Sequence, residues 1–181
     1  MLKQIKARFS KPVWQPLNQK CLNGKVDEVK KALAKGEDPN SRGIPLFRCC
    51  YEDCRCCHLP GKTPLMAATI GNHPKVVALL LSQPGIEVNV KCGTSGKTAL
   101  HFAMEKGRDA ALSLLLAAPG VDLNARDGGV WGWARTLGST PIQDAVHHGN
   151  VKAVRLMASV AEVDLDVKTP GGEGLEDLTH S

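Results

Sequence analysis

Three stretches of this chain follow one pattern: GKTPLMAATIGNHPKVVALLLSQPGIEVN at residues 61–89, GKTALHFAMEKGRDAALSLLLAAPGVDLN at residues 96–124, and GSTPIQDAVHHGNVKAVRLMASVAEVDLD at residues 138–166. Self-similarity at a period of roughly 20 to 50 residues indicates a stack of small supersecondary units. Such a stack presents one long surface and no enclosed cleft. It therefore suits the binding of another macromolecule better than catalysis.

The block that begins at Thr63 predicts two short helices. Thr63 is a good N-cap, because its hydroxyl can accept a backbone N–H that the first helical turn leaves unpaired. Pro64 then occupies the first helical position, where its missing N–H costs little. Gly71-Asn72 ends this helix, since glycine reaches the left-handed conformation cheaply. A second helix is predicted from about residue 74 to residue 82, before the helix-breaking Pro84-Gly85.

The recurring elements are a TPL-type start (TPLMAA, TALHFA, TPIQDA), a Gly followed by V-x-x-L, and a V-D-L-N end. Together they resemble the ankyrin repeat family over roughly residues 14–180. The resemblance implies an all-α solenoid of helix-turn-helix units with short β-hairpin fingers. It divides the chain into a basic N-terminal segment 1–13 and a repeat domain 14–181, with repeats at about 14–42, 61–92, 96–127 and 138–168 and a partial repeat at 169–181.

Composition fits one solenoid domain: the chain has 181 residues, and aromatic residues make up only 4 %. No apolar run approaches eighteen residues, so we expect no membrane span. The first fourteen residues lack the apolar core of a secretory signal. We therefore expect an intracellular monomer in the cytoplasm, with the nucleus as the alternative, and cysteines that start out reduced.

The net charge of +5 is unevenly distributed. Residues 1–35 hold nine Lys or Arg and two acids, a balance of +7, whereas residues 161–181 hold one Lys and six acids, a balance of −5. A basic end can attract nucleic acid or an anionic membrane surface. The interpretation that we favour is that both ends are charged because they face water. No nucleic-acid module accompanies the charge, so we do not expect nucleic-acid binding.

Two of the links between repeats are unusually long. We call the link from the Asn that closes one repeat to the Thr that starts the next a finger. The finger from Asn89 to Thr98 spans nine residues, whereas those that begin at Asn40 and Asn124 span twenty-three and sixteen. This predicts insertions at residues 43–60 and 128–137, which should project from the same edge of the stack. Insertions at one recurring point often mark the binding face of a repeat protein.

The later insertion contains Trp131, Trp133 and Arg135. Trp and Arg are the residue types that most often dominate protein interfaces. One interpretation is that these side chains contact a protein partner. The alternative is that the tryptophans fold back and fill a local gap, and the sequence leaves both open.

The earlier insertion holds five of the seven cysteines, followed at once by a histidine. Zinc needs four Cys or His ligands in tetrahedral arrangement, and a candidate set is Cys49, Cys54, Cys57 and His58. Cys92 stands at the equivalent position of the next finger and is a candidate ligand from outside. The crowded spacing differs from the usual two separated pairs. A redox-active or disulfide-forming loop, and exposed thiols or an acylation target without metal, remain alternatives.

We predict a protein-binding module, an adaptor, scaffold or inhibitor, whose partner contacts the fingers and the concave groove formed by the first helices. The residues expected to contact it are Arg48, Tyr51, Arg55, Met66, Thr69, Lys91, Phe102, Glu105, Trp131, Trp133, Arg135, Gln143 and Asp144. The alternative function is a zinc-dependent or thiol-redox sensor in which the Cys-rich finger gates this surface.

No catalytic motif is present, so we expect no enzyme activity and no cofactor apart from the zinc considered above. The resemblance implies a structural role for His101, within its own hairpin. It also implies that Asn89 and Asn124 are similar to positions that an oxygen-dependent asparaginyl hydroxylase modifies.

Overall fold

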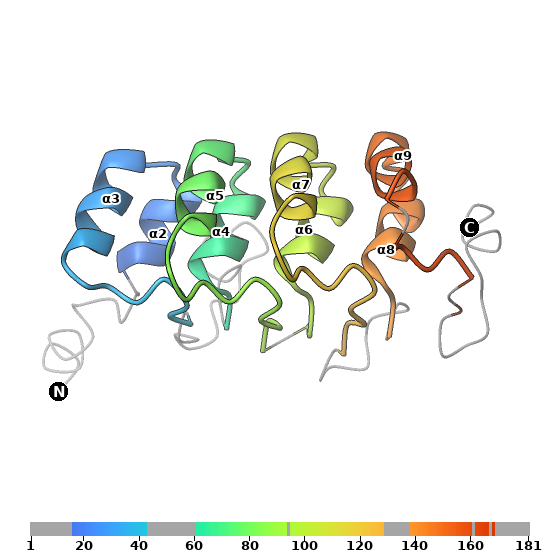
Figure 1. Ribbon diagram of the computed structural model, residues 1–181, viewed down its shortest axis with the longest axis horizontal. Helices are drawn as coiled ribbons and strands as arrows, with labels where there is room; N and C mark the ends of the chain where they lie inside the picture. Colours follow the sequence, from blue (N-terminus) through green and yellow to red (C-terminus); the bar gives the residue numbers. More distant parts are fainter. Residues whose placement is uncertain are drawn as a thin grey trace, which may run out of the picture.

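The computed structural model describes residues 16–42, 61–93, 95–128, 138–160, 162–166 and 168. Within these residues the helices form four pairs: α2 (Pro16–Leu22) with α3 (Val26–Ala34), α4 (Pro64–Ile70) with α5 (Pro74–Leu81), α6 (Ala99–Glu105) with α7 (Asp109–Leu116), and α8 (Pro141–His147) with α9 (Val151–Ala158). The pairs stand in a single row in the order of the sequence (Figure 1). The predicted all-α stack of helix-turn-helix units is confirmed.

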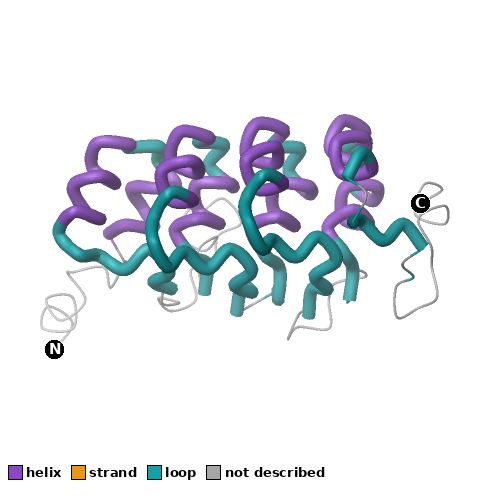
Figure 2. The backbone as a smooth tube through the Cα atoms, in the orientation of Figure 1, coloured by secondary structure: helices purple, strands orange, loops and turns teal. Residues whose placement is uncertain are grey.

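The row has two layers. The first helices α2, α4, α6 and α8 contact one another in succession, and so do the second helices α3, α5, α7 and α9. The loops that follow the second helices run along one edge of the stack (Figure 2). None of the described helices is long and apolar enough to cross a membrane.

Threonine starts the first helix of the last three described repeats, as predicted. Thr63 Oγ1 accepts a hydrogen bond from Met66 N at 3.3 Å, and the Thr63 N–H is in turn directed at Met66 Sδ. In the last pair Gln143 Oε1 accepts from Thr140 N at 3.0 Å. The third helical residue therefore bonds back to the residue before the helix, which satisfies donors that the first turn leaves free.

Each of these first helices ends at a left-handed residue. The φ angles are 59° at Asn72, 59° at Gly107 and 66° at Gly149. In the earliest of them Asn72, and not Gly71, adopts this conformation, because Gly71 has a helical φ of −68°. Asparagine tolerates the left-handed region better than other side chains, so the prediction placed the end correctly but assigned the turn to the wrong residue.

The core is a row of aliphatic side chains between the two layers. Its large members include Leu65, Leu80, Leu100, Leu112, Leu115, Ile142 and Met157. Alanines at the contacts between repeats, such as Ala68 and Ala103, are fully buried and allow the helices to approach closely. The last described pair is the most open, since Val151 on α9 is 65 % exposed.

No β-strand occurs in the described segments, so the fingers there are turns instead of the β-hairpins that the family resemblance implied. In the short finger Cys92 N donates to Lys97 O, and Gly96 N donates to Cys92 O, both at 2.8 Å. These two hydrogen bonds at the base of the short finger close a turn, but they do not form a ladder of paired residues.

Candidate functional site

A repeated asparagine contact fixes the base of each finger. Asn89 Nδ2 donates to Gly120 O at 2.7 Å, and Asn89 Oδ1 accepts from Asp122 N at 2.8 Å. Asn40 makes the same pair of bonds to the second repeat, and Asn124 makes them to the segment after α9. Each closing Asn thus binds the backbone of the following repeat, which holds the fingers in a fixed register.

The bases of the two long fingers lie on either side of the short one. The backbones approach so closely there that only glycine fits. If Gly61 carried a Cβ atom, it would lie 2.9 Å from Gly93 N, and a Cβ atom on Gly96 would lie 2.2 Å from Gly128 N. Gly128 N also donates to Ser95 O at 3.3 Å. Gly61 follows the first predicted insertion and Gly128 begins the other. The described residues next to both predicted insertions therefore lie beside one finger, at one edge.

The predicted residues within the long fingers lie outside the described residues. These are Arg48, Tyr51, Arg55, Trp131, Trp133 and Arg135, together with the candidate zinc ligands Cys49, Cys54, Cys57 and His58. Their roles stay predictions. Cys92, the candidate ligand from outside, is described and is 2 % exposed. In the described part of the chain, no group of three or more His, Cys, Asp or Glu side chains is placed to hold a metal ion.

Five residues expected to line an accessible groove are buried instead. Their exposed fractions are 1 % for Met66, 0 % for Thr69, 7 % for Phe102, 1 % for Gln143 and 0 % for Asp144. Position on the first helix was the basis of that expectation. In the structure Met66 and Gln143 cap their own helices, and Thr69 bonds to Leu65 O within its helix. Phe102 and Asp144 contact a lysine of the preceding repeat. They offer no surface to a partner in this structure.

Asp144, which is itself fully buried, belongs to a partly buried ion network between α6 and α8. Lys97 Nζ lies 2.8 Å from Asp144 Oδ2 and 2.9 Å from Glu105 Oε2, and Lys106 Nζ lies 2.6 Å from Glu105 Oε1. Asp144 Oδ1 is buried and accepts no hydrogen bond. Two carboxylates from adjacent repeats thus share one lysine, which links the third repeat to the fourth.

Burial and charge act differently on the members of this network. Burial raises the pKa of Asp144 to about 6, even though Lys97 lowers it. Burial alone would also raise the pKa of Glu105, but hydrogen bonds and charges from Lys106 and Lys97 outweigh it and bring the pKa to about 2. Burial alone would lower the pKa of Lys97, but the two carboxylates raise it above its usual value.

Lys62 occupies the position of Lys97 in the preceding repeat, because each directly precedes the capping Thr. Lys62 Nζ lies 5.3 Å from the ring centroid of Phe102, within the range of a cation–π interaction. Phe102 and Asp144 are likewise equivalent, each four residues after its Thr. Burial lowers the pKa of Lys62.

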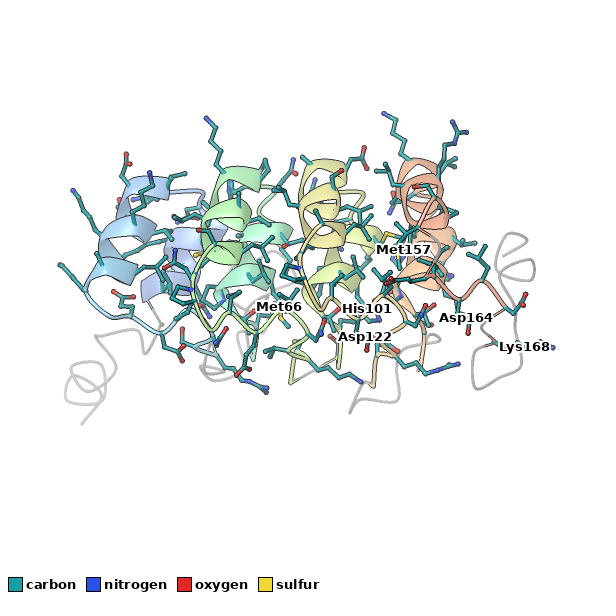
Figure 3. The ribbon with its side chains drawn as sticks, in the orientation of Figure 1. Met66, His101, Asp122, Met157, Asp164 and Lys168 are labelled. Atoms are coloured by element: carbon teal, nitrogen blue, oxygen red, sulfur yellow. The ribbon has the colours of Figure 1, made fainter. Side chains whose placement is uncertain are left out.

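His101 has the predicted structural role. Its Nδ1 lies 2.9 Å from Thr98 Oγ1, and its Nε2 lies 3.1 Å from Ser139 O in the next repeat. Since a carbonyl oxygen only accepts, Nε2 carries the proton. Burial lowers the pKa of His101 to about 4, so the ring is neutral at pH 7. Figure 3 shows His101 inside the stack.

Accessible polar side chains include Lys91 on the short finger, Lys106 after α6, and His147 and His148 at the end of α8. Of the described residues expected to contact a partner, Lys91 is exposed and Glu105 is partly exposed. Sequence reasoning left Lys106 out. The sequence feature that could have identified Lys106 is its position next to Glu105, directly after the end of a predicted first helix.

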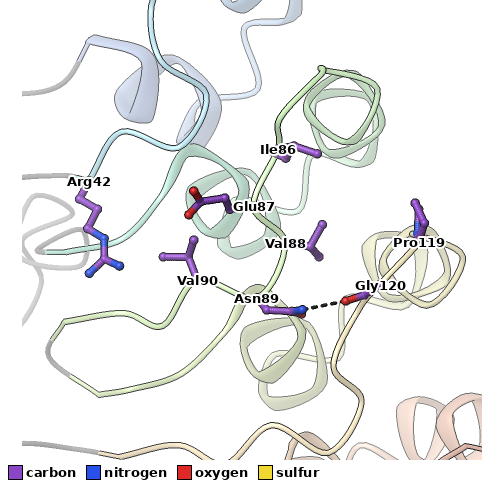
Figure 4. Close-up of a pocket in the computed structure, with 8 residues that line it drawn as sticks. All are labelled: Arg42, Ile86, Glu87, Val88, Asn89, Val90, Pro119 and Gly120. Atoms are coloured by element: carbon purple, nitrogen blue, oxygen red, sulfur yellow. Dashed lines mark hydrogen bonds between the residues drawn. The ribbon is translucent and has the colours of Figure 1, made fainter.

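Beside the finger bases lies a groove of about 450 Å³ lined by Arg42, Ile86, Glu87, Val88, Asn89, Val90, Pro119 and Gly120 (Figure 4). Residues from the loops after α3, α5 and α7 meet there. A second groove of about 310 Å³ lies on the outer layer between Leu33 and Leu79.

These features define a helical-repeat solenoid whose repeats are joined through their finger bases and a partly buried charge network. A family model for ankyrin repeats (3 copies) matches residues 17–127, and one for ankyrin repeats (many copies) matches residues 100–158. The chain belongs to the ankyrin repeat family, whose repeats generally mediate protein–protein interactions and are typically non-catalytic. No curated protein matches the chain significantly.

Proposed function

We propose that this chain is a protein-binding module that holds a partner across the finger edge and the exposed ends of the first helices. The observation that carries this proposal is the contact of the short finger with both neighbouring finger bases, Gly61 against Gly93 and Gly96 against Gly128. The residues next to the two insertions predicted at 43–60 and 128–137 therefore flank the short finger, one on each side. A partner can engage them together with the short finger.

The finger edge is also a rigid platform. Asn40, Asn89 and Asn124 each bind two backbone groups of the following repeat, at 2.7–3.1 Å. A surface held in register before binding loses less conformational freedom when a partner docks, so more of the contact energy appears as affinity. Loops on a fixed scaffold are where repeat proteins place recognition.

Accessible polar side chains lie both on the short finger and at the ends of the first helices. Lys91 is exposed on the short finger, and Lys106, His147 and His148 are exposed at the C-terminal ends of α6 and α8, whereas Met66, the side chain expected deeper in the groove, is buried. We therefore assign partner contact to the fingers and to the helix ends, and leave the buried groove residues out. Adaptor, scaffold and inhibitor roles would all use this surface.

Finger replacement tests the proposal. In one variant residues 45–58 are deleted, and in a second residues 130–136 are deleted, so that each long finger has the length of the short one. The matched control replaces Lys75 and Lys152, exposed on the second helices, with Ala. Wild type and variants are immobilised and exposed to cell extract, and retained proteins are identified by mass spectrometry.

We expect the wild type and the outer-helix control to retain the same proteins, and at least one finger variant to lose them while its circular dichroism spectrum stays helical. Equal retention by both finger variants would contradict the assignment of binding to this edge.

A further inference from the structure

One exposed cation per repeat follows the residue that closes the repeat, always two positions later. We call this set the basic row; its members are Arg42, Lys91, Arg126 and Lys168, which follow Asn40, Asn89, Asn124 and Asp166. All four members are exposed. Because the closing residues are equivalent, the row runs along the finger edge from the first repeat to the last.

Hydrogen bonds link three members of the row, and the first member, Arg42, lies next to them. Arg42 lines the same groove as Val90, the neighbour of Lys91 (Figure 4). Lys91 Nζ donates to Arg126 O at 2.8 Å. Arg126 Nη1 donates to Lys168 O at 3.1 Å and to Gly138 O at 2.9 Å. Lys91 and Arg126 thus each reach the backbone of the next member.

The charges of the row are not neutralised within the described part of the chain. The ion pairs found there join Lys20, Lys25, Lys97 and Lys106 to carboxylates, and none involves a member of the row. The hydrogen bonds of Lys91 and Arg126 go to uncharged carbonyl groups. The cations are therefore oriented along the stack and keep their capacity to bind an anion.

An acidic row runs beside the basic one, four residues earlier in each repeat: Asp38, Glu87, Asp122 and Asp164. Asp122 Oδ1 accepts from Asn124 N at 3.1 Å, and Asp164 Oδ1 accepts from Asp166 N at 3.0 Å, so these carboxylates are held to their own loops. Asp122, Asp164 and Lys168 follow one another along the stack in Figure 3.

We propose that the basic row binds an extended acidic segment of a protein partner, with one acidic side chain per repeat. Neighbouring helices in such a stack are about 8–10 Å apart, and an extended chain advances about 3.3 Å per residue. An acidic residue at every third position therefore matches the spacing of the cations. This inference rests on the proposed protein-binding function and specifies the chemistry of the partner.

The acidic row argues against a nucleic-acid partner. Four residues of extended chain span at most about 13 Å, and Glu87 of the acidic row lines the same groove as Arg42 of the basic row, so the two rows lie next to each other. A wide polyanion such as a duplex would place phosphates against the carboxylates, and like charges in contact are unfavourable. A single extended peptide is narrow enough to follow the cations alone.

The test uses the full chain and a fluorescent twelve-residue peptide with glutamate at every third position and Gly or Ser elsewhere. Fluorescence anisotropy measures its affinity in 50 mM and 300 mM salt. We expect binding that weakens with salt, and a loss of about tenfold in the double variant Lys91→Gln, Arg126→Gln, since exposed ion pairs contribute modestly each. The charge-conserving variant Lys91→Arg, Arg126→Lys should keep the affinity.

Three controls make the inference falsifiable. The double variant Lys75→Gln, Lys152→Gln removes the same charge from the outer helices and should leave the affinity unchanged. A peptide with its four glutamates in one block should bind more weakly than the spaced peptide. A twelve-nucleotide single-stranded DNA should not compete better than the spaced peptide. Failure of any of these three expectations, or unchanged affinity in the Lys91 and Arg126 variant, would overturn the inference.

The outcome is separable from that of the proposed function. Suppose that deletion within a long finger abolishes protein capture, but the acidic peptide does not bind. Protein binding at this edge then stands, and the proposal that the partner presents an acidic segment is wrong. If the finger deletions leave capture unchanged, the proposed function itself fails.

Discussion

Between α4 and α6, Lys62 lies over the ring of Phe102, whereas between α6 and α8, Lys97 lies between the carboxylates of Glu105 and Asp144. The two lysines precede equivalent threonines. Burial lowers the pKa of Lys62, but the carboxylates raise the pKa of Lys97 despite its burial. The lysine pKa at this position is thus lowered in one repeat and raised in the next. The reason is that the following repeat places Phe102 against Lys62 but Asp144 against Lys97.

The difference shows that each repeat-to-repeat contact in this stack has its own chemistry. In a solenoid, stability is approximately a sum of repeat and nearest-neighbour terms, so the two interfaces can be changed separately. The repeat that contains α8 also contacts the base of the finger that begins at Asn124, since Asp127 N donates to Ser139 O at 3.0 Å. Changes in the charge network between α6 and α8 are therefore expected to affect the finger edge, which is the proposed binding surface.

Replacing each lysine in turn should give the largest difference in stability between the α6–α8 and the α4–α6 interface. We expect Lys97→Met to lower the free energy of unfolding by roughly 3 kcal/mol, because it leaves buried Asp144 without its cation. We expect Lys62→Met to change it by about 1 kcal/mol or less, since a lost cation–π contact is offset by relief of lysine desolvation. Urea unfolding followed by circular dichroism measures both, and equal losses would remove the distinction.

Asp144→Asn should show how burial acts on the pH dependence of stability. The pKa of Asp144 is raised to about 6 in the folded state, so the folded protein takes up a proton more readily than the unfolded chain between about pH 6 and pH 4. The wild type should therefore gain stability relative to Asp144→Asn as pH falls through this window, by up to roughly 3 kcal/mol. In the wild type, Lys97 lowers the pKa of Asp144, whereas the charges of Asp127 and Glu105 add to the effect of burial and raise it.

A difference between wild type and Asp144→Asn that does not vary from pH 7 to pH 4 would mean that Asp144 is not buried as described. The measurement is denaturant unfolding of both proteins at four pH values in one buffer series.

Glu105→Gln should show the opposite slope. The pKa of Glu105 is lowered to about 2, so its carboxylate stabilises the fold above about pH 4.5 and this contribution is lost as pH falls toward 2. The wild type should lose stability relative to Glu105→Gln over that range. We expect roughly 1–2 kcal/mol, because its partner Lys106 is partly exposed and screened. Thermal melts of the two proteins from pH 5 to pH 3 would test the sign, and parallel curves would refute it.

Phe102→Leu should have the smallest effect. Leucine keeps the site apolar but removes the ring under Lys62, so we expect a loss of about 1 kcal/mol. The same circular dichroism assay applies. A loss as large as that of Lys97→Met would mean that the ring, and not the charge network, dominates the stack.

The sequence predicted the architecture well because the signals are local. Thr63 caps its helix, and the repeat period places α4 to α9 without reference to any distant contact. Cross-repeat contacts were harder. Lys97 and Asp144 are 47 positions apart, and their meeting depends on how one repeat sits on the next. Met66, Gln143 and Asp144 were expected on an accessible surface, but they are buried. Their positions on short helices do not reveal which side chains the adjacent repeat covers.

The basic row had a signal in the sequence that was not used. Counting two positions from each closing residue finds Arg42, Lys91, Arg126 and Lys168, but only the structure shows that Lys91 and Arg126 reach the next member. The β-hairpin fingers expected from the family resemblance could not be checked from residue types, since strand pairing depends on backbone hydrogen bonds across the turn.

The measurement that most directly tests the finger edge as the binding surface is site-specific photo-crosslinking. A photoreactive amino acid is placed at Lys91 in one protein and at Lys75, an exposed site on α5, in another. Both proteins are irradiated in the same cell extract, and crosslinked proteins are identified by mass spectrometry. We predict a discrete crosslinked protein from position 91 that is absent from position 75. Crosslinking from position 75 and none from position 91 would place the partner on the outer helices and contradict the assignment.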